Sequence, residues 1–145
     1  MGSMNIDQVA KGLEQTISTI ESELEKLGNR KEGTFYGDLL LSRGRALRDL
    51  SMISENSEEL LGYAIGSLTE AVNLFNRIRD EERSARAHYE LGMAYERLAG
   101  IKDHRRNMDI AIRAFDEAKE SLIYDDDPDL YRKIEERLKS AWKQY

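Results

Sequence analysis

The stretch "HYELGMAYERL", residues 88–98, decides the fold prediction because it places small residues inside an otherwise strong helical pattern. Gly92 and Ala94 lie among large side chains such as Tyr89 and Leu91. A glycine in a helix interior costs about 1 kcal/mol relative to alanine, so we expect a packing reason for Gly92. The helix that contains it is therefore predicted to press closely against another helix.

A related stretch, "LLSRGRALRDL" at residues 40–50, lies 48 residues earlier and repeats the same glycine, alanine and leucine pattern. Two further stretches match each other: "EAVNLFNRIRD" at 70–80 and "IAIRAFDEAKE" at 110–120 share an alanine and a phenylalanine. Their offset is 40 residues rather than 48, so about eight extra residues lie around "MISENSEE" in the first copy. Internal repetition of this kind predicts two related helical hairpins.

The positions of apolar and capping residues predict where the helices begin and end. Apolar residues along 6–27 recur at spacings of three and four, which places them on one side of a helix that Gly28 ends. The Asn56 side chain is expected to cap the third helix by accepting a bond from a free backbone N–H. Later helices are expected to begin after Asp80, Asp103 and Asp127.

Six helices, short connections and the lack of a strand pattern predict an all-α fold of antiparallel helical hairpins. The length of 145 residues predicts a single helical-repeat domain, residues 4–145. We divide it into a flanking helix, two hairpins and a C-terminal capping helix, at residues 4–28, 34–79, 81–124 and 128–144. Residues 1–3 are expected to be a cloning remnant ahead of a native Met4.

The composition argues against several classes of function. The formal charge is −6, so the chain has no general attraction for nucleic acid or for anionic membranes. It contains no cysteine, which excludes disulfides and thiolate metal sites and fits a reducing compartment. No apolar run approaches the length of a membrane-spanning helix. We therefore expect a cytoplasmic protein that binds neither nucleic acid nor membranes.

The repeated hairpins resemble the tetratricopeptide repeat, a family of paired antiparallel helices. The second copy carries the family's pattern of large, small and aromatic residues at His88, Leu91, Gly92, Tyr95, Ala111, Phe115 and Ala118. The first copy keeps Gly44, Ala71 and Phe75, with Arg43 and Leu47 where the family has a leucine and an aromatic residue. The resemblance covers about residues 36–128. It implies that the hairpins stack into a right-handed superhelix.

In such hairpins, small residues let the two helix backbones approach each other closely. Gly92 and Ala94 are therefore expected to face the following helix, with Ala111 opposite. Gly62 and Gly66 are interpreted in the same way, as points where a neighbouring helix comes close.

The resemblance also implies a concave groove lined by the first helix of each hairpin. Carried onto this sequence, the lining is Asp38, Leu41, Arg45, Arg48, Arg86, Tyr89, Met93 and Glu96. Arginine side chains bind carboxylates through paired hydrogen bonds, so an acidic or C-terminal segment of a partner protein is a candidate ligand. The alternative is that these arginines are only exposed, or paired with acids of the same chain.

Other polar residues carry no recognisable chemistry. His88 is interpreted as a packed histidine and His104 as a solvated one. Asp125, Asp127 and Asp129 have the spacing of a calcium loop, but Leu130 stands where such a loop needs glycine. These residues are interpreted as an acidic helix start, and we expect no metal site, cofactor or catalytic residue.

The expected function is therefore protein binding, with the chain acting as an adaptor or scaffold and not as an enzyme. The first alternative is a self-associating helical scaffold, a homodimer formed through the first helix or through the ends of the stack. Trp142 and Tyr145 belong to this question, because they either seal the last hairpin or form a contact there.

Overall fold

The computed structural model describes residues 5–145; Met4 and the expected cloning remnant, residues 1–3, lie outside the described part. Within residues 5–145 the chain forms six α-helices and no strand, which confirms the all-α prediction. The helices are α1 (Ile6–Leu27), α2 (Gly33–Ser51), α3 (Ser57–Arg77), α4 (Glu81–Ala99), α5 (His104–Ser121) and α6 (Pro128–Gln144). No helix in this described part is long and apolar enough to cross a membrane.

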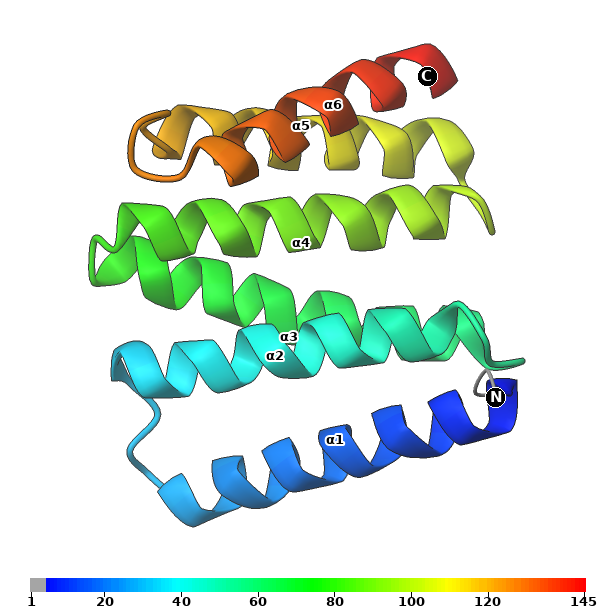
Figure 1. Ribbon diagram of the computed structural model, residues 1–145, viewed down its shortest axis with the longest axis vertical. Helices are drawn as coiled ribbons and strands as arrows, with labels where there is room; N and C mark the ends of the chain where they lie inside the picture. Colours follow the sequence, from blue (N-terminus) through cyan, green and yellow to red (C-terminus); the bar gives the residue numbers. More distant parts are fainter. Residues whose placement is uncertain (1–4) are drawn as a thin grey trace.

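The helices lie side by side in a stack, with α1 at one end and α5 and α6 at the other (Figure 1). Each helix packs against the next one along the chain, most extensively within the α2–α3 and α4–α5 hairpins. In addition, α4 contacts both α2 and α6, so that α2, α4 and α6 are neighbours. The predicted stack of antiparallel hairpins is therefore present.

Helix ends follow from local capping at most of the predicted positions. Gly28 ends α1 with a φ of 56°, a conformation that glycine adopts easily. The Asp80 and Asp127 carboxylates accept bonds of 3.1 Å from the backbone N–H groups of Arg83 and Leu130, at the starts of α4 and α6. The prediction that the Asn56 side chain caps α3 is wrong, because its backbone has φ −94° and ψ 39° rather than the extended conformation that side-chain capping needs.

Gly92 explains why the stretch at residues 88–98 contains a glycine. A Cβ atom at this position would lie 2.6 Å from the ring of Phe115 on α5, a side chain that is completely buried. The prediction that Gly92 faces α5 is confirmed, but the residue opposite is Phe115 and not Ala111. Ala94 instead packs in the cluster of α2 and α3 residues. Residues two positions apart on a helix, such as Gly92 and Ala94, point in nearly opposite directions.

The two hairpins use their glycines in different registers. A Cβ atom at Gly44 would overlap Leu68, whereas Phe75 lies against Gly37, two turns earlier in α2. The reason is that α3 has two more turns before Phe75 than α5 has before Phe115. The extra residues of the first hairpin therefore lengthen a helix and not the connecting turn.

Gly62 and Gly66 do not mark a close approach between helices, so that interpretation is wrong. Both are exposed on α3, and among residues 5–145 no heavy atom outside the local backbone lies within 4 Å of a Cβ added at either position. Internal packing thus gives no reason for these two glycines.

The apolar stripe of α1 packs on the chain's own first hairpin. Ile17 and Ile20 are buried, Leu24 and Leu27 pack against the cluster that includes α2 and α3, and Ile6 at the free end is exposed. At the other end of the stack, Trp142 is 59% exposed and contacts the ring of Tyr145 edge-on. Trp142 therefore does not seal the last hairpin.

Candidate binding surfaces

The helices α2, α4 and α6 together form a surface that we call the arginine face. It contains two hollows, with volumes of about 100 Å³ and about 240 Å³. Seven of the eight residues predicted to line the groove line one of these hollows: Leu41, Arg45, Arg48, Arg86, Tyr89, Met93 and Glu96. Asp38 lines neither hollow; its carboxylate lies 3.0 Å from the Arg83 guanidinium.

Two of the predicted arginines pair with one buried acid on α4. Arg48 is only 13% exposed in its side chain and forms an ion pair and hydrogen bond with Glu90. The other Glu90 oxygen lies 3.5 Å from Nε of Arg45, whose side chain is 58% exposed. Arg48 thus serves as a structural link between α2 and α4, whereas most of the Arg45 side chain is exposed to solvent.

Arg86 joins α4 to the start of α6. Its guanidinium lies 2.6 Å from the Asp127 carboxylate and 3.7 Å from that of Glu82. The same Asp127 side chain caps α6, so it serves two structural contacts at once. This accounts for the acidic stretch at residues 125–129 as a helix start held by an arginine.

Glu96 is the least satisfied polar group on this face. Its side chain is 11% exposed; Gln144 donates a 3.1 Å hydrogen bond to Oε2, and Arg137 lies 3.8 Å from the same atom. The second oxygen, Oε1, is buried and has no hydrogen-bond partner among residues 5–145. Glu96 therefore holds the C-terminal part of α6 against α4 and is not presented to solvent.

Sequence reasoning missed several residues of the arginine face. Glu90 was not among the predicted groove residues, and α6 was predicted only as a capping helix. In the structure, Lys133 lines the smaller hollow, and Arg137 and Gln144 line the larger one. The spacing of four between Lys133 and Arg137 indicates one side of α6, but only the packing of α6 beside α4 brings that side to the groove.

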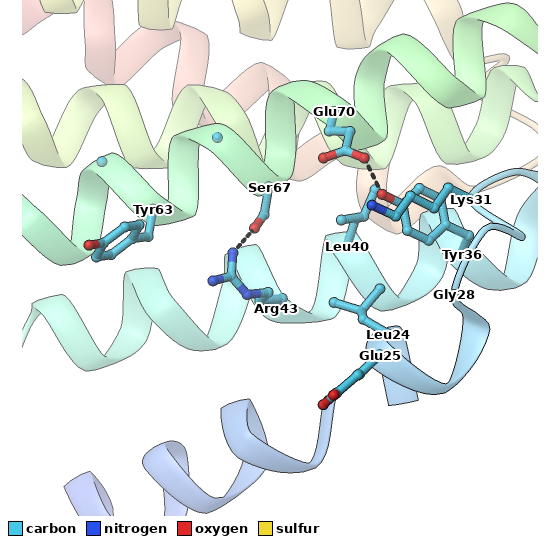
Figure 2. A pocket seen from close by; sticks show the side chains of 12 residues that line it. Leu24, Glu25, Gly28, Lys31, Tyr36, Leu40, Arg43, Tyr63, Ser67 and Glu70 are labelled. Atoms are coloured by element: carbon cyan, nitrogen blue, oxygen red, sulfur yellow. Dashed lines mark hydrogen bonds between the residues drawn. The ribbon is translucent and has the colours of Figure 1, made fainter. Parts of the chain in front are cut away.

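A larger hollow lies on a different part of the molecule, between α1 and α3 and above α2. We call it the α1–α3 hollow; its volume is about 650 Å³ (Figure 2). Leu24 points from α1 toward Leu40 on α2, and the exposed ring of Tyr63 lies at the far end. None of the residues that line this hollow was predicted as functional.

Hydrogen bonds join two pairs of polar side chains in the α1–α3 hollow, Tyr36 with Glu70 and Arg43 with Ser67 (Figure 2). The Tyr36 hydroxyl donates to Glu70, and burial together with this carboxylate raises the pKa of Tyr36 to about 12. Arg43 donates to the Ser67 hydroxyl and lies 3.2 Å from Glu21. These partners hold the walls of the hollow in place, and none of them is arranged as a nucleophile with its base.

The histidines lie in two different settings. His88 is half-buried on α4, and burial lowers its pKa below the ordinary value of 6.5, an effect that Glu117 partly opposes. This agrees with its interpretation as a packed histidine. His104 is exposed, and its two ring nitrogens lie 3.2 Å and 2.7 Å from the carbonyl oxygens of Ala99 and Gln144. It links the turn after α4 to the end of α6.

No protein-family model, curated protein or solved structure matches this chain. The resemblance to the tetratricopeptide repeat therefore depends on the sequence pattern alone. Across residues 5–145, no group of three or more histidine, aspartate or glutamate side chains lies close enough together to hold a metal ion.

Proposed function

We propose that this chain is a protein-interaction module, and that its arginine face binds an acidic or C-terminal segment of a partner protein. One observation supports the proposal above the others. Seven of the eight residues that the sequence predicted to line the groove, all but Asp38, line two neighbouring hollows on the same three helices. Such a surface is expected of a tetratricopeptide-like adaptor, and a cytoplasmic location is part of the same proposal.

Charge supports the choice of an acidic ligand. Although the whole chain has a formal charge of −6, the arginine face gathers Arg45, Arg86 and Lys133 around its smaller hollow and Arg97 and Arg137 around the larger one. Arg45 and Arg86 keep about half of their side-chain surface exposed despite their ion pairs. A carboxylate ligand would compete with Glu90 and Asp127 for these guanidinium groups.

Apolar side chains give the face a second means of recognition. Leu41, Tyr89 and Leu130 line the smaller hollow beside the arginines, and Met93 lines the larger one. A peptide that places apolar side chains here and carboxylates on the arginines would bury apolar surface while its charges set the orientation. No chemical step is part of this function.

The test is a titration with a short synthetic peptide rich in glutamate, made with a free and with an amidated C-terminus. We expect Arg45→Glu with Arg86→Glu to weaken binding by at least about tenfold, because two attractive contacts become repulsive. The matched control is Lys26→Glu with Arg113→Glu. It makes the same change of charge and also removes two ion pairs, on α1 and α5.

If the control pair weakens binding as much as the arginine-face pair, only the net charge matters and the proposal is wrong. Thermal unfolding of both double variants checks that each remains folded. If the unchanged protein binds the peptide with a free C-terminus but not the amidated one, the site recognises a C-terminal carboxylate.

The alternative of a self-associating scaffold has less apolar surface to use than the sequence suggested. Ile17 and Ile20 of α1 are buried within the chain, so the exposed large side chains of its apolar stripe are Ile6 and Val9, and Trp142 and Tyr145 are exposed at the other end of the stack. Solution mass across a concentration series distinguishes the two functions. A stable dimer would favour the scaffold, whereas a monomer that binds the acidic peptide favours the adaptor.

A further inference from the structure

The α1–α3 hollow is an open groove of about 650 Å³ lined by residues of α1, α2 and α3. In the described part of the chain α1 packs on α2 but not on α3, so α2 forms the floor and the other two helices form the walls. The floor and walls present Leu24, Leu40 and Tyr63 to the hollow. Grooves with this arrangement in other proteins accept an amphipathic helix through its apolar side.

The α3 wall is unusually flat because of its glycines. Gly62 and Gly66 are one turn apart, both line the hollow, and a Cβ added at either would meet open space. Each lowers the stability of α3 by about 1 kcal/mol relative to alanine, and the fold gains no contact in return. Gly44 and Gly92 differ, because a bulky side chain from the adjacent helix lies against each of them.

Charge indicates which kind of helix fits. The lining of the α1–α3 hollow itself is balanced, with Glu25 and Glu70 against Lys31 and Arg43. A second hollow adjoins it at Gly62 and adds three carboxylates and one cation: Glu55, Glu58, Glu59 and Lys102. The end of the combined groove near the start of α3 is thus acidic, and complementary to a cationic ligand.

We propose that the α1–α3 hollow docks a basic amphipathic helix of another protein, with small or apolar residues against Gly62, Gly66 and Tyr63. This surface is separate from the arginine face and takes a ligand of opposite charge, so the inference goes beyond the proposed function. A second copy of this chain is a poorer occupant. Glu59 and Glu70 flank the glycines, and in either direction two α3 helices would bring acids against acids.

The test uses a synthetic helix as long as α3, with an alanine and leucine stripe flanked by lysines, and a scrambled peptide of the same composition. Binding is followed by fluorescence anisotropy at low and high salt, and by amide chemical shifts. We expect the helix to bind and the scrambled peptide to bind at least about tenfold more weakly. The shifts are expected at Gly62, Tyr63 and Gly66, and high salt should weaken the complex because charges contribute to it.

The deciding variant is Gly62→Leu with Gly66→Leu. The two leucine side chains would occupy the groove, and the space around both positions accepts them without a clash in the fold. We expect it to weaken binding of the synthetic helix at least about tenfold. Gly12→Leu is the matched control, since Gly12 is an exposed helical glycine on α1 with no neighbour within 4 Å in the described chain. It should bind like the unchanged protein.

Unchanged affinity in the leucine double variant would overturn the proposal, as would equal binding of the scrambled peptide. Self-association that the same double variant abolishes would overturn it too, by assigning the groove to a second copy. These results are independent of the arginine face, because the Arg45→Glu and Arg86→Glu variant retains the α1–α3 hollow and the acidic peptide does not fit its charge.

Discussion

The helical glycines of this chain fall into two groups at the scale of single residues. Gly37, Gly44 and Gly92 lie against buried side chains of the next helix, and a methyl group would collide with them. Gly62 and Gly66 have open space around the same position. The sequence pattern around each glycine is helical in both groups, so only the packing separates them.

Alanine substitutions should therefore act in opposite directions at the two kinds of glycine. We expect Gly92→Ala to lower the free energy of unfolding by about 1 kcal/mol or more, because the clash with buried Phe115 exceeds the gain in helix propensity. We expect Gly62→Ala to raise it by about 0.5–1 kcal/mol. Thermal unfolding measures both; a stabilising Gly92→Ala would contradict the packing account.

His88 should make the stability of the protein depend on pH. Burial lowers its pKa in the folded state, so as pH falls below about 6.5 the unfolded chain takes up the proton first. The stability associated with His88 is therefore complete above this pH and is lost as pH falls through the folded-state pKa. We expect His88→Leu to reduce the loss of stability between about pH 7 and pH 5, measured by urea unfolding.

His104→Leu is the control for the His88 experiment, because it removes the other histidine, which lies exposed at the end of α6. An unfolding curve for His88→Leu that changes with pH as steeply as the unchanged protein would show that His88 is not desolvated.

At the scale of helices, the pair formed by Arg48 and Glu90 is the most buried polar link between α2 and α4. Removing one member leaves the other charged and nearly buried, so we expect Glu90→Ala to lower the free energy of unfolding by about 2–4 kcal/mol. Replacing both members, as in Arg48→Met with Glu90→Leu, should recover much of that loss, because no buried charge remains. A double-mutant cycle by urea unfolding measures the difference.

If Glu90→Ala costs no more than an exposed substitution such as Glu120→Ala, the pair is solvated and the link between the helices is purely apolar. That result would also mean that Arg48 is available to bind a ligand. The burial of its side chain predicts the opposite.

Most helices could be predicted from the sequence because their signals are local. Gly28, Asp80, Gly100 and Asp127 end or begin helices through contacts within one or two turns. The register between helices could not be predicted in the same way. Phe75 and Phe115 match in sequence, yet Phe75 meets Gly37 because α3 is longer at its start; the sequence indicates that extra length but not which residue of α2 each residue of α3 contacts.

At the scale of the whole molecule, the groove residues could be chosen because the resemblance to the tetratricopeptide repeat implies a groove lined by the first helix of each hairpin, and all of them but Asp38 line the two hollows. The contribution of α6 could not, since nothing local shows that it packs beside α4. The α1–α3 hollow was missed for the same reason: its walls come from helices that are not neighbours in sequence. Its only local signal was the pair Gly62 and Gly66, and the sequence pattern predicted that a neighbouring helix packs closely against them.

The most direct test of the central claim is an amide chemical-shift map of the protein titrated with the acidic peptide. The account predicts shifts on α2, α4 and α6 around Arg45, Tyr89 and Lys133, and their loss in the Arg45→Glu and Arg86→Glu variant. Shifts spread over the positively charged ends of the helices, or centred on α1, α3 or α5, would contradict the claim that the arginine face is the binding surface.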